Sequence, residues 1–300
     1  MSDAQTLLEQ FSQQMADAVE QVGRSIVTVY GRRRQPSSGF AFAQNLVLTA
    51  SHALERTRDL RIGTPDGRKL AAELVGRDDL TDLAVLRVGQ LDVPTASQTA
   101  AARVGQIALA VARPAEDGLM ASLGVVSKLL RSPAMSRARW AGRLDRVIQT
   151  DAIPYPGFSG GLLILPSGAV LGMLTSSLLP GIAAAIPLDV ALPLAQALAH
   201  QGYLKRGYLG VLTQQVALPA AQRTASRQRG LLVVRVEDNS PAEQGGMMVG
   251  DVIVSVDERP VNDADDLLEA VSAASIGQPL RLGVLRGGAC STVTVAVGER

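Results

Sequence analysis

Cysteine, histidine and aromatic residues are scarce in this chain of 300 residues, and each shortage excludes something. The single cysteine, Cys290, rules out a disulfide within the chain. With only two histidines and no CxxC pair, the chain lacks the spacing of a Cys/His metal site, so no metal is expected. Aromatic residues make up 3% of the chain, so any core must be packed from aliphatic side chains.

Excess charge and long apolar runs are also missing. The 29 basic residues nearly balance the 28 acidic ones, which argues against a nucleic-acid partner. The local run Arg32, Arg33 and Arg34 is interpreted as a solvated loop. The chain contains no run of eighteen apolar residues, so no membrane span is expected. The N-terminus lacks a secretory apolar segment, so the chain as written is expected in the cytoplasm; a trimmed N-terminus would instead fit the periplasm or another extracytoplasmic space.

The residues that are abundant favour short strands. Hydrophobic residues make up 47% of the chain, and 29 glycines and 15 prolines supply turns. Residues 4–22 have helical spacing, whereas residues 25 to about 190 hold short apolar runs between turn signals. This pattern predicts a mainly β fold with one or two barrels. A helix at 189–202 then leads to a second unit, so we expect segments 1–24 (helical), 25–202 and 203–300.

Three segments of the first unit carry side chains that fit acyl-transfer chemistry. His52 follows the run 46–48, Asp82 directly precedes the run 84–88, and Ser159 stands among glycines before the run 161–165. A serine hydroxyl needs a histidine to take its proton and a buried carboxylate to fix that histidine's tautomer. Asp78 and Asp79 compete with Asp82 for the carboxylate role.

The glycines around Ser159 have a mechanical explanation. A tight turn can direct the backbone N–H groups of Gly157 and Ser159 at one point, where the oxyanion of the reaction forms. Loss of one such donor costs about 3–4 kcal/mol of transition-state stabilisation. The sequence therefore predicts an oxyanion hole made of these two amides.

The order and setting of these segments resemble the HtrA (Deg) family of serine proteases. The resemblance implies a chymotrypsin-like double β-barrel, with His52 as general base, Asp82 as its orienting carboxylate and Ser159 as nucleophile. It is carried, in the family's order, by Leu48-Thr-Ala-Ser-His52, Asp79-Leu-Thr-Asp82-Leu-Ala-Val-Leu, Gly124-Val-Val-Ser127, Ile148-Gln-Thr-Asp-Ala152, Gly157-Phe-Ser-Gly-Gly161 and Ala185-Ile-Pro187.

The chain departs from the family pattern beside the nucleophile. Phe158 stands where the family usually has Asn, Leu162 replaces a Pro, and the preceding run is Ile153-Pro-Tyr-Pro156. These changes put the substrate preference and the resting geometry of the site in question, while the triad stays complete. The loop between the first two strands is reduced to about 31–39, so regulation through it is not expected.

A different hydrolase fold is the rival interpretation of the same serine. Gly157 to Gly161 also fits G-x-S-x-G, the α/β-hydrolase elbow, and Asp189 and His200 follow in that fold's order. The elbow requires a helix after the serine, whereas a strand-like run follows here, so we disfavour it.

The second unit resembles a PDZ domain. Ser240 to Gly250 carries the signature, and the segment Tyr208, Leu209, Gly210 and Val211 matches the carboxylate-binding loop of HtrA-type PDZ domains. In such domains a C-terminal peptide adds a strand beside this loop. Leu209, Val211, Leu267 and Val271 fit equally well as pocket or as core.

The expected function is ATP-independent cleavage of unfolded or misfolded proteins after small aliphatic residues, with no cofactor. The resemblance implies a homotrimer, for which Phe11 or Tyr30 are candidate contacts. One alternative is a catalytically latent peptide-binding module or holdase chaperone, in which Phe158 keeps the site collapsed. Another is an esterase that does not cleave protein.

Overall fold

The computed structural model describes residues 3–96, 99–115, 118–131, 144, 146–179, 181–224, 227–271 and 276–299. The chain divides into two compact units, Met1–Leu204 and Lys205–Arg300. The division falls close to the predicted boundary at residues 202 and 203. No helix in the described ranges is long and apolar enough to cross a membrane.

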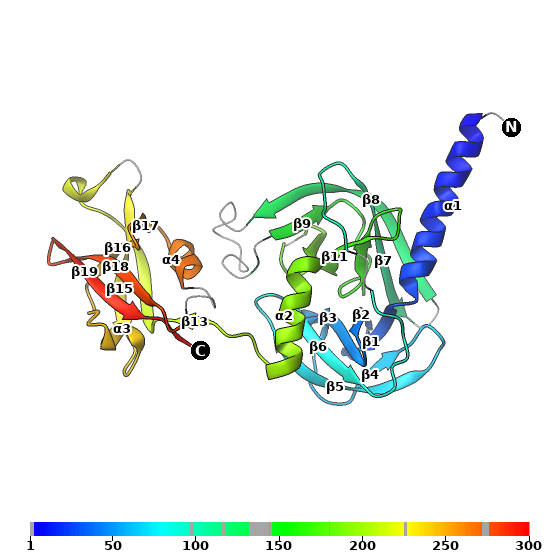
Figure 1. Ribbon diagram of the computed structural model, residues 1–300, viewed down its shortest axis with the longest axis horizontal. Coiled ribbons are helices and arrows are strands. Elements are labelled where there is room, and N and C mark those ends of the chain that lie inside the picture. The colour runs from blue at the N-terminus through cyan, green and yellow to red at the C-terminus, as the bar shows by residue number, and fades with distance from the viewer. Residues whose placement is uncertain are drawn as a thin grey trace. The chain divides into compact units, whose positions relative to one another are not determined.

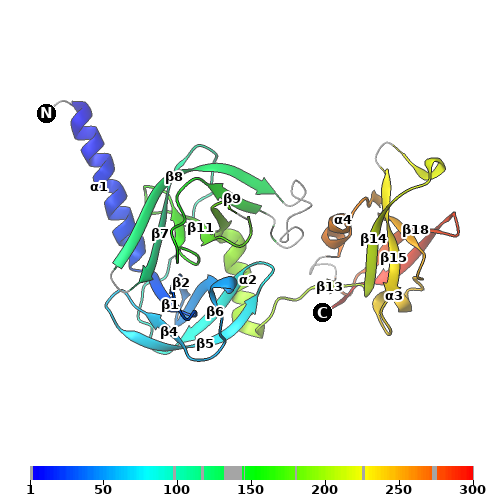
Figure 2. The ribbon, with the colours of Figure 1, turned by 180° about the vertical axis from the view of Figure 1, so that it is seen from behind.

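The first unit holds two closed six-stranded barrels, which lie side by side in Figures 1 and 2. The N-terminal barrel has the strand order β1-β2-β3-β6-β5-β4, and the C-terminal barrel β10-β11-β12-β9-β8-β7. The predicted double barrel is confirmed. Its strands are β1 Ile26–Tyr30, β2 Ser37–Ala43, β3 Leu46–Ala50, β4 Leu60–Gly63, β5 Lys69–Asp78, β6 Leu83–Val88, β7 Ile107–Ala115, β8 Gly118–Arg131, β9 Arg146–Thr150, β10 Leu162–Ile164, β11 Val170–Thr175 and β12 Ala184–Pro187.

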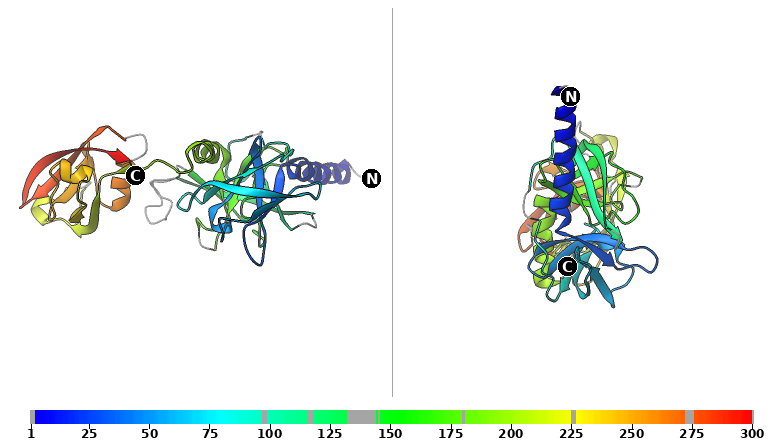
Figure 3. Two further views of the ribbon diagram at one scale, coloured as in Figure 1. Left: turned by 90° about the horizontal axis from the view of Figure 1, so that it is seen from below. Right: turned by 90° about the vertical axis from the view of Figure 1, so that its right-hand side faces the viewer.

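Two helices pack on the barrels. α2 (Leu188–Gln201) lies against β5, β6 and β11 and ends at Gly202, whose φ of +81° is left-handed. α1 (Asp3–Gly23) packs its C-terminal half against β7, with Ala18 and Val22 buried. The other end of α1 extends beyond the barrels (Figure 3), so Leu7 and Leu8 are exposed.

Aliphatic side chains fill the core, as the scarcity of aromatics predicts. Successive residues of a strand point to opposite faces, so one strand serves two clusters. In β1, Val27 and Val29 join a cluster confined to the N-terminal barrel, whereas Ile26 joins a cluster shared by both barrels and both helices. This shared apolar cluster fixes one barrel against the other, which sets the geometry of any site between them.

The second unit is a sheet of order β14-β15-β16-β18-β19, in which β17 pairs with β16, and a short β13-β20 ladder. One helix, α4, follows β17, and residues 272–275 lie outside the described part. The elements are β13 Gly207–Tyr208, β14 Val211–Ala217, β15 Arg229–Val236, α3 Pro241–Gln244, β16 Val252–Val256, β17 Arg259–Pro260, α4 Ala264–Ala270, β18 Pro279–Arg286, β19 Ala289–Ala296 and β20 Gly298–Glu299, with short 3-10 turns at Ser51–Ala53 and Ala220–Gln222 in the chain.

Candidate active site

The N-terminal barrel brings His52 and Asp82 together. His52 lies in the 3-10 turn that follows β3, and Asp82 lies in the turn between β5 and β6 with a φ of +59°. Nδ1 of His52 is 2.8 and 2.9 Å from the two carboxylate oxygens of Asp82. A carboxylate can only accept, so Nδ1 carries the proton and Nε2 is left as the acceptor.

The Asp82 carboxylate is buried and has further donors. It also accepts from the backbone N–H of His52 at 2.9 Å and from the Thr175 hydroxyl of β11. The Asp82 residue is 1% exposed, so these donors replace the water that a carboxylate would otherwise bind. Thr175 belongs to the C-terminal barrel, and its hydrogen bond therefore ties the two barrels together at this carboxylate.

The two competing aspartates have other partners. Asp78 accepts from the N–H and the hydroxyl of Thr81, which closes the turn before Asp82. Asp79 accepts from the Ser51 hydroxyl at 2.6 Å and pairs with Arg77. The Ser51 hydrogen bond, and after it Arg77, hold the pKa of Asp79 below its ordinary value. Neither carboxylate contacts the His52 ring, so the geometry favours Asp82.

The C-terminal barrel supplies Ser159 from a strained turn. Gly157 and Gly160 flank it with φ values of +86° and +87°. A Cβ at Gly160 would collide with the carbonyl oxygen of Ser38, so only glycine fits there. The Ser38 backbone N–H donates to the Ser159 carbonyl at 3.1 Å, and the Ser38 hydroxyl donates to the Gly157 carbonyl at 2.9 Å. Strand β2 of the other barrel thus holds the turn in place.

The amides of the turn are available to a ligand. Within the described ranges, the backbone N–H groups of Gly157 and Ser159 make no hydrogen bond, whereas the Phe158 N–H donates to the Tyr155 carbonyl. Phe158 is 1% exposed and packs edge-on against Tyr155 in the core of the C-terminal barrel. The Phe158 side chain is thus held in the barrel core, although the residue also lines the pocket at Ser159.

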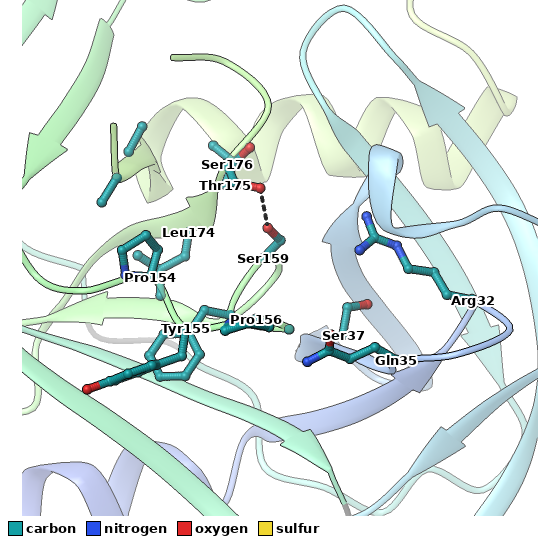
Figure 4. A pocket seen from close by; sticks show the side chains of 14 residues that line it. Arg32, Gln35, Ser37, Pro154, Tyr155, Pro156, Ser159, Leu174, Thr175 and Ser176 are labelled. Carbon is teal, nitrogen blue, oxygen red and sulfur yellow. Dashed lines mark hydrogen bonds between the residues drawn. The ribbon is translucent and has the colours of Figure 1, made fainter. Parts of the chain in front are cut away.

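Ser176, which the sequence did not single out, lies between the serine and the histidine. Its hydroxyl is 3.1 Å from Oγ of Ser159 (Figure 4). The same hydroxyl is 3.2 Å from Nε2 of His52. No direct hydrogen bond joins Ser159 to His52 among the described residues. Ser176 and Thr175 belong to three consecutive hydroxyl residues at a strand end. That signal is weak, because such clusters are common in turns.

The pocket at Ser159 has two chemically different ends. Figure 4 shows Pro154, Tyr155, Pro156 and Leu174 on one side of Ser159 and a polar group on the other side. Phe158, Ala183 and Ala184 add to the apolar end, and Arg32, Gln35 and Ser37 form the polar end.

The rival elbow is not present. Ser159 leads into strand β10, not into a helix. Asp189 pairs with Arg146, and His200 lies in the last turn of α2. The α/β-hydrolase interpretation is therefore wrong.

The predicted PDZ loop is a sharp connection between β13 and β14. Gly210 has a φ of +83°, and a Cβ there would collide with Ser240. The carbonyls of Leu209 and Gly210 accept from Ala242 and Glu237, respectively. The amides of Leu209 and Gly210 make no hydrogen bond within the described ranges.

The strand beside this loop has one free edge. β14 is an end strand of the sheet and pairs with β15 alone. α4 packs near β14, so the loop, the strand and the helix frame one side of the sheet. Of the four residues that fitted pocket or core, Leu209, Leu267 and Val271 lie in the core cluster of this unit, and Val211 is only partly buried against it.

Comparison with known proteins assigns each of the two units to a domain family. The family of trypsin-like peptidase domains matches residues 37–173, and the PDZ domain family matches residues 207–297. The chain is 33% identical over 276 residues to a probable periplasmic serine endoprotease, DegP-like, of Halomonas elongata, covering 89% of this chain and 57% of the relative. It is 32% identical over 298 residues to the putative serine protease HhoA of Synechocystis, covering 92% and 74%.

Solved structures agree with this assignment. The HtrA-type protease AlgW with a decapeptide superposes with a TM-score of 0.77 at 27% identity, covering 95% of this chain and 98% of that one. The serine endoprotease from Yersinia pestis superposes with a TM-score of 0.76 at 27% identity and the same coverage. The chain spans a little over half the length of the DegP-like relatives. By its paired barrels, its PDZ unit and its relatives, the chain belongs to the HtrA/Deg family of serine proteases.

Proposed function

We propose that the chain is an ATP-independent serine endopeptidase that degrades unfolded or misfolded proteins. In this proposal Ser159 is the nucleophile, His52 the general base and Asp82 the carboxylate that orients it. The observation that carries it is the buried Asp82 carboxylate, which binds Nδ1 of His52 and leaves Nε2 facing the hydroxyls of the other barrel. The names of the DegP-like relatives support the same chemistry.

The proposed reaction needs only groups of this chain. As Oγ of Ser159 attacks the scissile carbonyl carbon, its proton passes to Nε2 of His52. The oxyanion forms in front of the amides of Gly157 and Ser159, which have no other partner within the described ranges. Collapse of the intermediate breaks the C–N bond, and the imidazolium gives its proton to the leaving nitrogen. Water then hydrolyses the acyl-enzyme by the same steps, without a metal or a cofactor.

The apolar end of the pocket supports cleavage after small aliphatic residues. Leu174, Ala183 and Ala184 line it, and the side chains of Phe158 and Tyr155 close it. No charged side chain lies at this end among the lining residues. A Val or Ala side chain before the scissile bond is therefore the preferred occupant in this proposal.

The second unit is proposed to bind the C-termini of peptides at Tyr208, Leu209, Gly210 and Val211. The unpaired amides of Leu209 and Gly210 suit a terminal carboxylate, and the free edge of β14 suits the extended peptide. Titration calorimetry with a peptide ending in an apolar residue tests this. The free acid is expected to bind, and the same peptide with a C-terminal amide to bind at least ten times more weakly.

The chain is also proposed to assemble into a homotrimer. No nucleic-acid partner is proposed. The exposed Leu7 and Leu8 and the partly buried Phe11 follow one another along α1 and suit a contact between copies. Tyr30 is the other candidate, and Lys69 Nζ already lies 5.5 Å from its ring centroid. Sedimentation of wild type and a Phe11→Ser variant tests this assembly.

Digestion of unfolded β-casein by wild type and by Ser159→Ala tests the protease itself. Cleavage by wild type alone supports both the activity and the nucleophile, and the fragment ends give the specificity. A fluorophosphonate should label wild type and not the variant. If neither protein cuts nor is labelled, the latent peptide-binding module or holdase replaces this proposal.

A further inference from the structure

The polar end of the Ser159 pocket contains one member of the arginine run that the sequence assigned to a solvated loop. Arg33 and Arg34 are exposed, but Arg32 is half-buried and lines the pocket together with Gln35 and Ser37 (Figure 4). The run lies in a loop, as expected, but the three arginines are not equivalent, because Arg32 is half-buried and not fully solvated.

Arg32 is held in place beside the general base. Its Nη2 donates to the backbone carbonyl of His52 at 2.8 Å. Within the described ranges no carboxylate pairs with Arg32, although the guanidinium is planar and suited to bind one. The positive charge of Arg32 therefore faces the pocket without a partner of opposite charge.

Two buried polar atoms on this wall lack a hydrogen-bond partner. They are Nε of Arg32 and Oγ of Ser37, and Ser37 is 1% exposed. A buried polar group left unpaired loses its hydrogen bonds to water without replacement, so such groups are rare in native proteins. Two of them on the wall of one pocket indicate a binding site for an acceptor group of the substrate.

The chemistry of the reaction decides which part of the substrate reaches this wall. The part of the substrate before the scissile bond stays attached to Ser159 in the acyl-enzyme. In the proposed function its side chain occupies the apolar end of the pocket. His52 must give its proton to the leaving nitrogen, so the leaving part lies on the His52 side of Ser159. Arg32 contacts His52, and it therefore faces the residues that follow the scissile bond.

We propose that Arg32 and Ser37 form a specificity subsite for an acidic side chain directly after the scissile bond. The Glu or Asp carboxylate accepts from the Arg32 guanidinium at the pocket wall, and from the Ser37 hydroxyl once that side chain turns toward the pocket, because Arg32 Nε and Ser37 Oγ are themselves buried. The inference rests on the proposed peptidase function and adds a substrate class to it: sites with a small aliphatic residue before the cut and an acidic residue after it.

Internally quenched peptides test this subsite. Three peptides share one sequence with Val before the cut and differ only in Glu, Gln or Lys after it. Wild type is expected to cleave the Glu peptide with a kcat/KM at least about tenfold above the Gln peptide, a difference of about 1.4 kcal/mol, because a charged acceptor binds the guanidinium more strongly than a neutral amide does. Arg32→Gln should abolish the Glu-to-Gln ratio, and Arg32→Glu should reverse the preference toward Lys.

Two controls separate the subsite from the protease. Arg33→Gln and Arg34→Gln remove the same charge from the same loop and should leave the Glu-to-Gln ratio unchanged. Fluorophosphonate labelling reports whether Ser159 is reactive in each variant, independently of the leaving group. A labelled wild type with equal rates on all three peptides overturns the subsite and leaves the protease standing. Failure to label wild type overturns the protease and the subsite with it.

Discussion

For each hydrogen bond of the His52 ring, the chemistry of the partner determines which atom donates and which accepts. Asp82 accepts and cannot donate, so Nδ1 of His52 donates to it and Nε2 accepts. The Ser176 hydroxyl then donates to Nε2 and accepts from Ser159. Substitution of the Asp82 carboxylate and substitution of the Ser176 hydroxyl should therefore have opposite effects on the reactivity of Ser159.

Removal of the Asp82 charge should abolish most of the activity. Asp82→Asn presents an amide N–H to Nδ1 and favours the wrong tautomer of His52, so kcat on casein should fall by about 10⁴-fold. Asp79→Asn is the matched control, because Asp79 binds Ser51 and Arg77 and not the ring. Equal losses in the two variants would contradict the assignment of Asp82.

Removal of the Ser176 hydroxyl should have the opposite effect. Ser159 can reach Nε2 only after Ser176 has left it, and a hydrogen bond of this kind contributes about 1 kcal/mol. Ser176→Ala should therefore speed fluorophosphonate labelling of Ser159 by about fivefold. Ser176→Thr keeps the hydroxyl and should label at the wild-type rate. Slower labelling of the alanine variant would show that Ser176 relays the proton instead.

Sequence reasoning reached the residues with distinctive settings and not their neighbours. His52, Asp82 and Ser159 each stand at a strand end in a recognisable order. Ser176 and Arg32 do not, because their positions depend on how the two barrels meet. The burial of Phe158 in the barrel core was also not predicted, because its place beside Ser159 in the sequence does not reveal the direction of its side chain.

At the scale of an element, the Ser159 turn depends on glycine at a point of close approach. Gly160 and Gly67 have nearly the same φ, +87° and +86°, but only Gly160 has a backbone neighbour where a Cβ would lie. Gly67 therefore needs glycine only for its left-handed backbone, whereas Gly160 also needs it because a side chain has no room there.

Gly160→Ala should abolish casein cleavage and fluorophosphonate labelling, because the added methyl group displaces Ser38 and the turn it holds. Gly67→Ala should lose only the roughly 1–2 kcal/mol of a left-handed alanine and keep full activity. Thermal unfolding measures the stability loss in each variant. Normal labelling of Gly160→Ala would mean that the turn tolerates a shift relative to β2.

Two of the strands that sequence reasoning missed, β5 and β8, have mixed faces. The apolar runs that it did find, such as those of β3 and β6, consist mostly of residues buried on both faces. β5 alternates exposed and partly buried residues, and β8 is largely exposed, so neither forms an apolar run. A search for period-two alternation would have found β5.

The two units have separate cores, so each is expected to respond by itself to a mutation in its interior. In the second unit, the Asp251 carboxylate is buried and accepts from Arg286 and from the Met248 N–H. The Arg286 hydrogen bonds hold the pKa of Asp251 below its ordinary value. Ionised Asp251 therefore stabilises this unit, and acid should weaken it.

Asp251→Asn should lower the unfolding temperature of the PDZ unit, by the equivalent of about 1–3 kcal/mol, and leave Ser159 labelling unchanged. Because the folded-state pKa is lowered, the difference from wild type should be complete above about pH 4 and shrink as pH falls further. Calorimetry from pH 7 to pH 3 measures it. Glu258→Gln, which breaks an exposed pair with Arg281, should change nothing. A pH-independent difference would contradict the role of the Asp251 charge.

For the whole molecule, the resemblance to a family predicted which domain comes first. Composition and the pattern of apolar runs predicted only the number of units and their mainly β character. Which barrel strands close on which partners follows from long-range pairing, such as that of β1 with β4 or β10 with β7. No local pattern encodes such pairings.

Ser159 and His52 come from different barrels, and their separation is set by the shared apolar cluster together with the hydrogen bonds of Ser38 and Thr175 across the seam. A displacement of one ångström between reacting groups lowers a rate by about a hundredfold. A small shift of one barrel against the other would therefore separate Ser159 from His52 while each barrel stayed folded. Residues at the seam between the barrels are expected to affect the proposed activity without contacting Ser159.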